Sequence, residues 1–296
     1  MSEPPPLPTP YPDAPPVISQ SPATGGIVGA KDGQSGKEAA LPPNEIRLSG
    51  RPATMILLVF LGAQFGAGFF VAVLGGIFAG VAHAIHHSVF PLAQGDAEMK
   101  SAMTGLALIL GFVAGGVAMV LMSVSLVRER LGDCSPTGAA WVYGPRKKIA
   151  QGFGVGVLVA LCYALANAAF QGLGARPTPG PLTRLATTPG LSQLAWSVVA
   201  LLLAPPIEEL LFRGVLYGGY RRSLGAPAAA ALTTSIFVVL HLSEIIQYLP
   251  SALGIAGLAL TALWFRLRSA AIGPAVAVHF GYNLVIVLAT ACYVWR

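Results

Sequence analysis

Long apolar stretches recur along the chain from Ala53 onward, separated by short polar segments. Most of them reach the ~20 residues that a helix needs to cross the hydrocarbon core of a bilayer. The pattern therefore predicts an all-α, polytopic transmembrane helix bundle. We expect about seven spans, with six and eight as the neighbouring counts, at residues 53–82, 102–127, 149–170, 191–220, 228–248, 251–265 and 270–294.

The fourth stretch, 191–220, contains Pro205-Pro206, and this pair predicts a break in the helix. Lipid cannot satisfy free backbone groups, so the break should pack against protein or line a water-filled cavity.

Residues 1–50 differ in composition from the rest of the chain. They are rich in Pro, Gly and Ser and hold few large apolar residues, which predicts a disordered tail. No early apolar segment of the signal-peptide type precedes Ala53, so we expect the tail to stay on the mature protein. This organisation divides the chain into a tail at 1–50, an N-terminal set of transmembrane helices at 51–190 and a C-terminal transmembrane region at 191–296.

Composition and charge support a membrane protein. The 296-residue chain is 54% hydrophobic and only 10% charged, which excludes a water-soluble globule. Its net charge of +6 comes without a basic stripe carrying interleaved aromatic residues, so nucleic acid is not an expected partner. Under alternating spans most Lys and Arg residues fall on one face, which predicts a cytoplasmic N-terminus and an outer C-terminus. These residues are Arg47, Arg51, Arg128, Arg130, Arg146, Lys147, Lys148, Arg221, Arg222, Arg266 and Arg268.

Three polar motifs interrupt the apolar stretches of the C-terminal region: Glu208-Glu209-x-x-x-Arg213, Phe237-x-x-x-His241 and His279-x-x-x-Asn283. At ~1.5 Å of rise per residue, each motif lies about 16–20 Å from the charged end of its predicted helix. Ionisable groups at membrane depth cost several kcal/mol each unless they serve one another. Their common depth predicts that the three helices bring these groups together as an intramembrane active site.

The spacing within each motif gives the expected roles. Glu209 and Arg213 are four residues apart and should form an ion pair. Glu208 is rotated by about 100° from Glu209, so we expect it to face the histidines and to act as a general base. Together with His241 and His279 it can hold and activate one water molecule, with or without a metal. Asn283 can donate to a developing oxyanion or orient a histidine.

Three sequence segments, EELLFR, FVVLH and HFGYN, carry a resemblance to the CPBP family of intramembrane proteases, which includes the type II CaaX prenyl endopeptidases and the Abi-like proteins. The resemblance covers residues 194–287. It implies that Glu208 activates the attacking water, that Glu209 and Arg213 support it, and that Asn283 stabilises the oxyanion. It also implies membrane-tethered protein substrates cut near their C-termini, either prenylated CaaX tails or bacterial sorting anchors, and the sequence does not choose between these.

The resemblance leaves the cofactor open. It implies that His241 and His279 position either water or a metal, and with Glu208 they match the ligand count of Zn or another divalent ion. The zinc-protease pattern HExxH is absent from the chain, and a mechanism driven by glutamate alone has also been argued for the family.

Simpler interpretations stand beside the catalytic one. Glu209 and Arg213 can be a structural ion pair, and Glu244 is more simply a helix-end residue than an accessory acid. His83, His86 and His87 have metal-ligand spacing, although interfacial histidines without a task explain them more simply. At the level of the whole protein, the alternatives are a non-catalytic Abi-like immunity or partner-binding protein and a proton or cation transporter. The absence of an internal repeat counts against the transporter.

Overall fold

The computed structural model describes residues 48–86, 93–131, 144–176 and 178–294. All regular secondary structure within these ranges is helical, which confirms the predicted all-α class. The described residues all belong to one compact unit, residues 40–296. The predicted tail at 1–50 therefore lies almost entirely outside the described residues.

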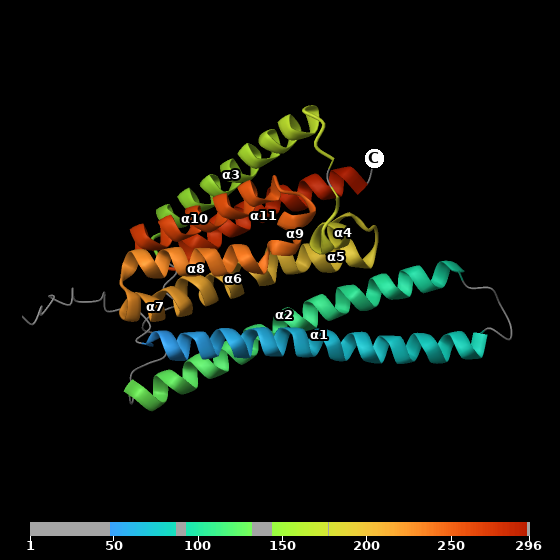
Figure 1. Ribbon diagram of the computed structural model, residues 1–296, viewed down its shortest axis with the longest axis horizontal. Helices are drawn as coiled ribbons and strands as arrows, with labels where there is room; N and C mark the ends of the chain where they lie inside the picture. The colour runs from blue at the N-terminus through green and yellow to red at the C-terminus, as the bar shows by residue number, and fades with distance from the viewer. Residues whose placement is uncertain (1–47, 87–92, 132–143, 177, 295–296) are drawn as a thin grey trace, which may run out of the picture. The chain divides into compact units, whose positions relative to one another are not determined.

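Figure 1 labels the helices in chain order. Their bounds are α1 Gly50–His86, α2 Ala93–Leu131, α3 Arg146–Gly172, α4 Pro181–Thr187, α5 Leu191–Val198, η1 Val199–Leu203, α6 Ala204–Glu209, η2 Leu210–Leu216, α7 Tyr217–Leu224, α8 Ala226–Leu240, α9 Leu242–Gln247, α10 Ser251–Ser269 and α11 Gly273–Val294.

Five helices in the described ranges are long and apolar enough to cross a membrane, compared with the seven expected. They are Gly50–Phe78, Met103–Leu126, Arg146–Gly172, Leu191–Leu224 and Gly273–Cys292. The difference has two sources. The stretch 228–248 is divided at His241, which leaves α8 with 15 residues. Helix α10 has 19 residues but carries Arg266 and Arg268 in its last turn.

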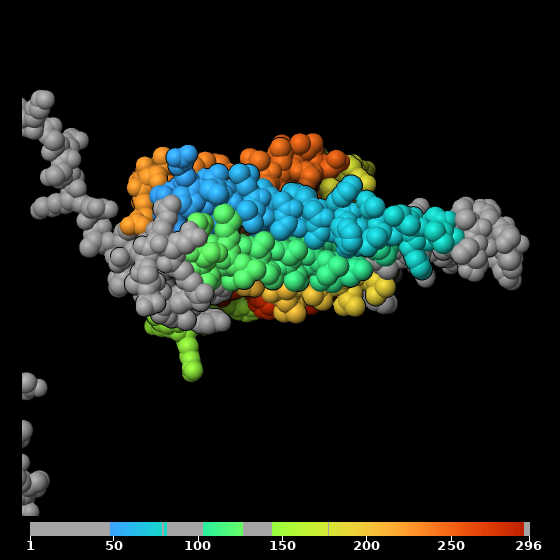
Figure 2. All heavy atoms as spheres, turned by 90° about the horizontal axis from the view of Figure 1, so that it is seen from below, coloured from blue at the N-terminus to red at the C-terminus, as the bar shows by residue number. Residues whose placement is uncertain are grey.

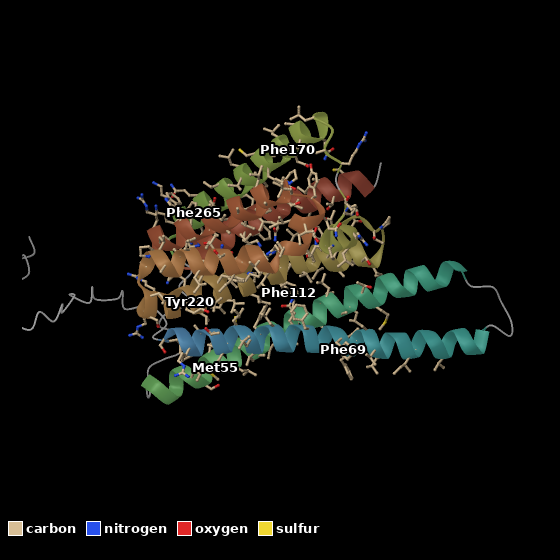
Figure 3. All side chains as sticks on the ribbon, in the orientation of Figure 1. Met55, Phe69, Phe112, Phe170, Tyr220 and Phe265 are labelled. Carbon is tan, nitrogen blue, oxygen red and sulfur yellow. The ribbon has the colours of Figure 1, made fainter. Side chains whose placement is uncertain are left out.

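Large apolar side chains cover the outer surface of these helices. On α1, Phe65, Phe69, Phe70 and Phe78 are each more than half exposed. Figure 3 shows Phe69 on the side of α1 that faces away from the other helices, and Figure 2 shows α1 and α2 lying side by side across one face. Exposed apolar surface of this extent would be unstable in water and matches a lipid environment. The chain is a membrane protein.

Helices α5, η1, α6, η2 and α7 follow one another without interruption from Leu191 to Leu224, and we call this stretch the motif helix. The predicted break at Pro205-Pro206 is not a gap in the helix. Instead, the helix changes to π-helical hydrogen bonding at Val199–Leu203, just before the prolines, and again at Leu210–Leu216, just after the two acids. Such π segments accommodate one extra residue inside an α-helix and are frequent at functional sites.

Glycines set the close packing between α3 and α11. A Cβ atom at Gly152 would overlap the Pro274 carbonyl, and one at Gly156 would overlap the Val278 carbonyl. These two glycines are four residues apart, the small-residue spacing that lets membrane helices approach closely. Helix α11 is thereby held against α3 along its first half, which is the part that carries the third motif.

The charged ends of several helices lie together. The backbone N–H of Gly50, at the start of α1, donates to Ser223 Oγ near the end of α7 (2.9 Å). Figure 1 shows the starts of α3, α8 and α11 and the end of α10 on this same side. The helix ends at which the sequence carries these basic residues therefore lie at one end of the bundle.

Candidate active site

A polar cavity of about 410 Å³ lies where the motif helix meets α8 and α11. Glu208, His241, His279 and Asn283 all contribute to its lining, although they come from three separate apolar helices. Phe112 of α2 also lines it, and Figure 3 places this residue between α2 and the motif helix. The structure therefore brings the three sequence motifs together around one cavity, as their common depth predicted.

Asn283 is held by a hydrogen bond that depends on the π segment. The backbone N–H of Ala204 donates to the carbonyl of Val199 rather than to that of Ala200. In this register the next donor, to the Ala200 carbonyl, would be residue 205, and proline has no N–H. Asn283 Nδ2 donates to the Ala200 oxygen instead (2.7 Å). The proline pair and the asparagine thus fix α11 to the motif helix beside the cavity.

Glu209 is fully buried and connects two helices. Its Oε1 lies 3.2 Å from Arg213 Nη1 and accepts a hydrogen bond from His279 Nδ1 at 3.0 Å. The predicted ion pair with Arg213 is present, and Glu209 is also the nearer of the two acids to His279, which the sequence did not indicate. A buried carboxylate is tolerated only when it is paired and hydrogen-bonded, and Glu209 meets both conditions through Oε1, while its buried Oε2 accepts no hydrogen bond.

Arg213 is also buried and is held from several sides. Its Nη2 donates to the carbonyl of Ala259 on α10 (2.8 Å), and its guanidinium lies 4.8 Å from the centre of the Phe237 ring. Arg266 Nε donates in turn to the carbonyl of Arg213 (3.2 Å). Arg266 is only 4% exposed, so it packs inside the bundle although its position in the sequence placed it with the loop charges.

Glu208 differs from Glu209 in reaching the cavity and in lacking the partners that Glu209 Oε1 has in Arg213 and His279. Its side chain is 12% exposed at the cavity, and its buried Oε2 accepts no hydrogen bond. His279 Nε2 lies 4.0 Å from this oxygen. In a neutral ring, His279 Nδ1 donates its proton to Glu209, which leaves a lone pair on Nε2. Two proton acceptors therefore face each other across a gap too long for a direct hydrogen bond.

His241 lies in the turn that separates α8 from α9. Its Nδ1 donates to the carbonyl of Phe237 one turn earlier (2.8 Å), and its ring stacks on the Phe237 ring with centres 4.6 Å apart. A neutral His241 therefore also has an unprotonated Nε2. The F-x-x-x-H spacing has a clear structural reason, because Phe237 supplies both the acceptor and the stacking surface.

Residues 190–285, which contain all three motifs, match the family model described as type II CAAX prenyl endopeptidase, Rce1-like. We call this matched region the Rce1-like domain. The match agrees with the resemblance to CPBP proteases stated above and includes all the acidic residues and histidines that line the polar cavity. Comparison with curated proteins and with solved structures gives no match.

The residues of the Rce1-like domain fit a metal only in part. Both histidines are tethered through Nδ1 and leave Nε2 free, as metal-ligating histidines commonly do. A zinc site, however, needs three protein ligands around one point. No group of three His, Cys, Asp or Glu side chains in the described part of the chain has that arrangement. We therefore derive no chemical step through a metal.

Glu244 lies in the wall of the same cavity and does more than end a helix. Its two carboxylate oxygens accept hydrogen bonds from the Leu182 backbone N–H and the Thr183 hydroxyl, both at 2.7 Å. A Cβ atom at Gly180 would overlap this carboxylate. Glu244 thus fastens the short helix α4 against the Rce1-like domain. Local spacing could not predict this contact, because the partners of Glu244 lie about sixty residues earlier in the chain.

The sequence also offers a candidate metal cluster outside the Rce1-like domain. The side chains of His83, His86 and His87 lie outside the described residues, so their prediction stays open.

Proposed function

We propose that this chain is an intramembrane endopeptidase in which Glu208 activates the attacking water. One observation carries the proposal: the unpaired Oε2 of Glu208 faces His279 Nε2 across 4.0 Å at the wall of a cavity of about 410 Å³. Because these two proton acceptors do not bond to each other, a hydrogen-bond donor can lie between or beside them. Water is the donor that peptide hydrolysis requires.

The proposed reaction uses these groups in order. Glu208 takes one proton from water as the oxygen bonds to the scissile carbonyl carbon, and the negative charge moves to the carbonyl oxygen. Asn283 uses one hydrogen of Nδ2 for Ala200, and the second is free to donate to this oxyanion. The carbon–nitrogen bond then breaks as Glu208 returns its proton to the leaving nitrogen. His241 and His279 position the water through Nε2.

Glu209 and Arg213 act through His279 in this proposal. The Arg213 guanidinium pairs with Glu209 Oε1, and Glu209 fixes the tautomer of His279 by accepting from Nδ1. These two residues are therefore positioning residues. Removing them should weaken catalysis even though neither touches the substrate.

The substrates proposed here are membrane-anchored proteins cut near their C-termini. The matching family model is described as type II CAAX prenyl endopeptidase, and a protease of this type implies membrane-anchored protein substrates. A polar cavity enclosed by apolar spans is reached from within the bilayer more easily than by a soluble peptide. An experiment decides whether these tails are prenylated or are sorting anchors. The membrane proteome of cells carrying the wild type is compared with that of cells carrying Glu208→Gln. C-terminal peptides that differ between the two identify the substrates.

The test of the mechanism uses the purified full chain in liposomes with a substrate found in this way. Glu208→Gln should lower the cleavage rate by at least about 100-fold, the lower range for loss of a general base. Glu244→Gln is the matched control, because it makes the same change in the same cavity wall at a carboxylate that fastens α4. It should keep most of the activity. Equal losses in both variants would reject Glu208 as the base.

A zinc or other divalent ion stays a prediction for this site. Metal analysis of the purified protein and of a His241→Ala/His279→Ala variant, together with cleavage after exhaustive chelation, tests it. Loss of activity on chelation with recovery on adding back the metal would show that a metal is required.

A further inference from the structure

A second cavity lies on the other side of the motif helix and α11, which form part of the wall of the polar cavity. We call it the outer groove. It has a volume of about 770 Å³ and lies between the first turns of α3, the middle of the motif helix and the start of α11. Its size falls within the ~300–1,000 Å³ typical of small-molecule sites. The residues that line it are almost all apolar, among them Ile149, Phe153, Leu202, Leu210, Val276 and Phe280.

The outer groove opens toward the lipid. Leu202 is 63% exposed and Phe153 is 37% exposed, and both belong to helices of spanning length. An unfilled apolar groove loses dispersion contacts along its whole lining. In a bilayer the molecules able to fill it are hydrocarbon chains, since water finds no hydrogen-bonding partners on this lining.

One end of the outer groove is positively charged. Arg146 lines it at the first residue of α3, and Lys147 and Lys148 follow directly. Neither α3 nor α11 has an acidic residue in its first turn, so no nearby carboxylate on these two turns offsets the charge. The N-terminal end of α3 adds its own positive partial charge. Basic residues at a membrane surface attract anionic headgroups.

We propose that the outer groove binds an anionic phospholipid, with an acyl chain along the apolar lining and the phosphate at Arg146. The basic residues lie at the end of α3, and the apolar lining lies one to two turns deeper. An anionic phospholipid has the same order, with its phosphate at the membrane surface and its acyl chains below. Phe153 is seven residues after Arg146, which corresponds to about 10 Å along the helix axis.

This site is separate from the polar cavity but shares its walls. Ala204 and Glu208 face the polar cavity, whereas Pro205 and Pro206 face the outer groove. On α11, His279 faces the former and Phe280 the latter. A bound chain would therefore fill the space behind both catalytic walls. The proposal does not require the protein to be a protease, because lipid binding is measured directly.

The experiment measures phospholipid bound to the full chain. The protein is reconstituted into nanodiscs of equal parts phosphatidylglycerol and phosphatidylcholine and released into mild detergent, and the retained lipid is identified by native mass spectrometry. The wild type should retain phosphatidylglycerol over phosphatidylcholine by roughly tenfold, as expected for several basic residues near one phosphate.

Three variants separate the parts of the site. Replacing Arg146, Lys147 and Lys148 with Gln should abolish the preference while leaving the groove able to hold either lipid. Ala150→Trp places a large ring in the groove from an exposed position and should lower the retention of both lipids severalfold. Leu158→Trp, at a lipid-exposed position of α3 outside the groove, should behave as the wild type.

A matched charge control distinguishes a site from general attraction. Replacing Arg51, Arg222 and Arg268 with Gln removes the same charge from the same end of the bundle but outside the groove, and the preference should stay. The proposal is overturned if the wild type shows no preference, if this control loses it equally, or if Ala150→Trp retains as much lipid as Leu158→Trp. Melting temperatures of all variants exclude misfolding as the cause.

Discussion

At the scale of single residues, the two adjacent glutamates have opposite surroundings. Both have a buried Oε2 without a hydrogen bond, but Glu209 is fully buried and its Oε1 pairs with Arg213 and His279, whereas Glu208 reaches the cavity. Stability and activity should therefore depend on different members of the pair. Glu209 is tied to two helices through Oε1, which suits a structural role, whereas Glu208 lies at the cavity, which suits contact with a substrate.

The first prediction separates these two roles by stability. Glu209→Gln leaves Arg213 buried without a counter-charge, and removing one member of a buried pair typically costs about 3–5 kcal/mol. Glu208→Gln removes no hydrogen bond formed by Oε2 and should leave the free energy of unfolding nearly unchanged. Thermal unfolding in detergent, monitored by circular dichroism, measures both. A Glu208→Gln variant destabilised as much as Glu209→Gln would contradict the assignment.

At the scale of elements, the π segment beside Pro205-Pro206 creates the acceptor that Asn283 occupies. This gives the second prediction. Asn283→Ala leaves the Ala200 carbonyl unpaired and should cost about 1–3 kcal/mol. Pro205→Ala restores an N–H at the residue that can reach this carbonyl in the π register. The cost of Asn283→Ala should therefore be smaller in the Pro205→Ala background.

A double-mutant cycle of these two changes, measured by thermal unfolding, checks the interpretation. Additive effects would show that the asparagine and the proline do not share one acceptor.

The third prediction concerns the packing of α3 against α11. Gly156→Ala places a Cβ atom against the Val278 carbonyl and should cost about 1–3 kcal/mol as α11 is forced away. Because Val278 precedes His279, the cleavage rate should fall as well. Gly154→Ala is the control from the same helix, since a Cβ there meets no atom within 4 Å and should be tolerated. Equal melting temperatures for the two variants would show that the close approach is not required.

At the scale of the whole molecule, the charged helix ends lie together, and we propose that this end and the N-terminus are cytoplasmic. The fourth prediction tests the orientation in cells that carry the protein with its native cysteines replaced. Leu173→Cys follows the end of α3, and Leu224→Cys ends the motif helix at the charged side. A membrane-impermeant maleimide should label Leu173→Cys in intact cells and Leu224→Cys only after permeabilisation. The reverse pattern would invert the topology.

Much of this arrangement could be predicted from the sequence, because apolar length and helical spacing are local properties. The all-α class, the meeting of the three motifs and the pairing of Glu209 with Arg213 all follow from them. The π segments could not be predicted in this way, since the choice between hydrogen-bond registers depends on Asn283, which lies 83 residues after its acceptor. Arg266 and Glu244 were missed for a similar reason: their partners lie on helices remote in the chain.

The two π segments also affect how this region is compared with other proteins. Each holds about one residue more than the α-helical turn that it replaces, and together they bracket the two glutamates. A relative with a regular α-helix here would need a one-residue gap on each side of the acidic pair before its side chains matched in space. Deleting Leu202 alone would turn the first part of the helix by about 100° relative to Glu208. A one-codon deletion could thus disable the site without removing any charged residue of the protein.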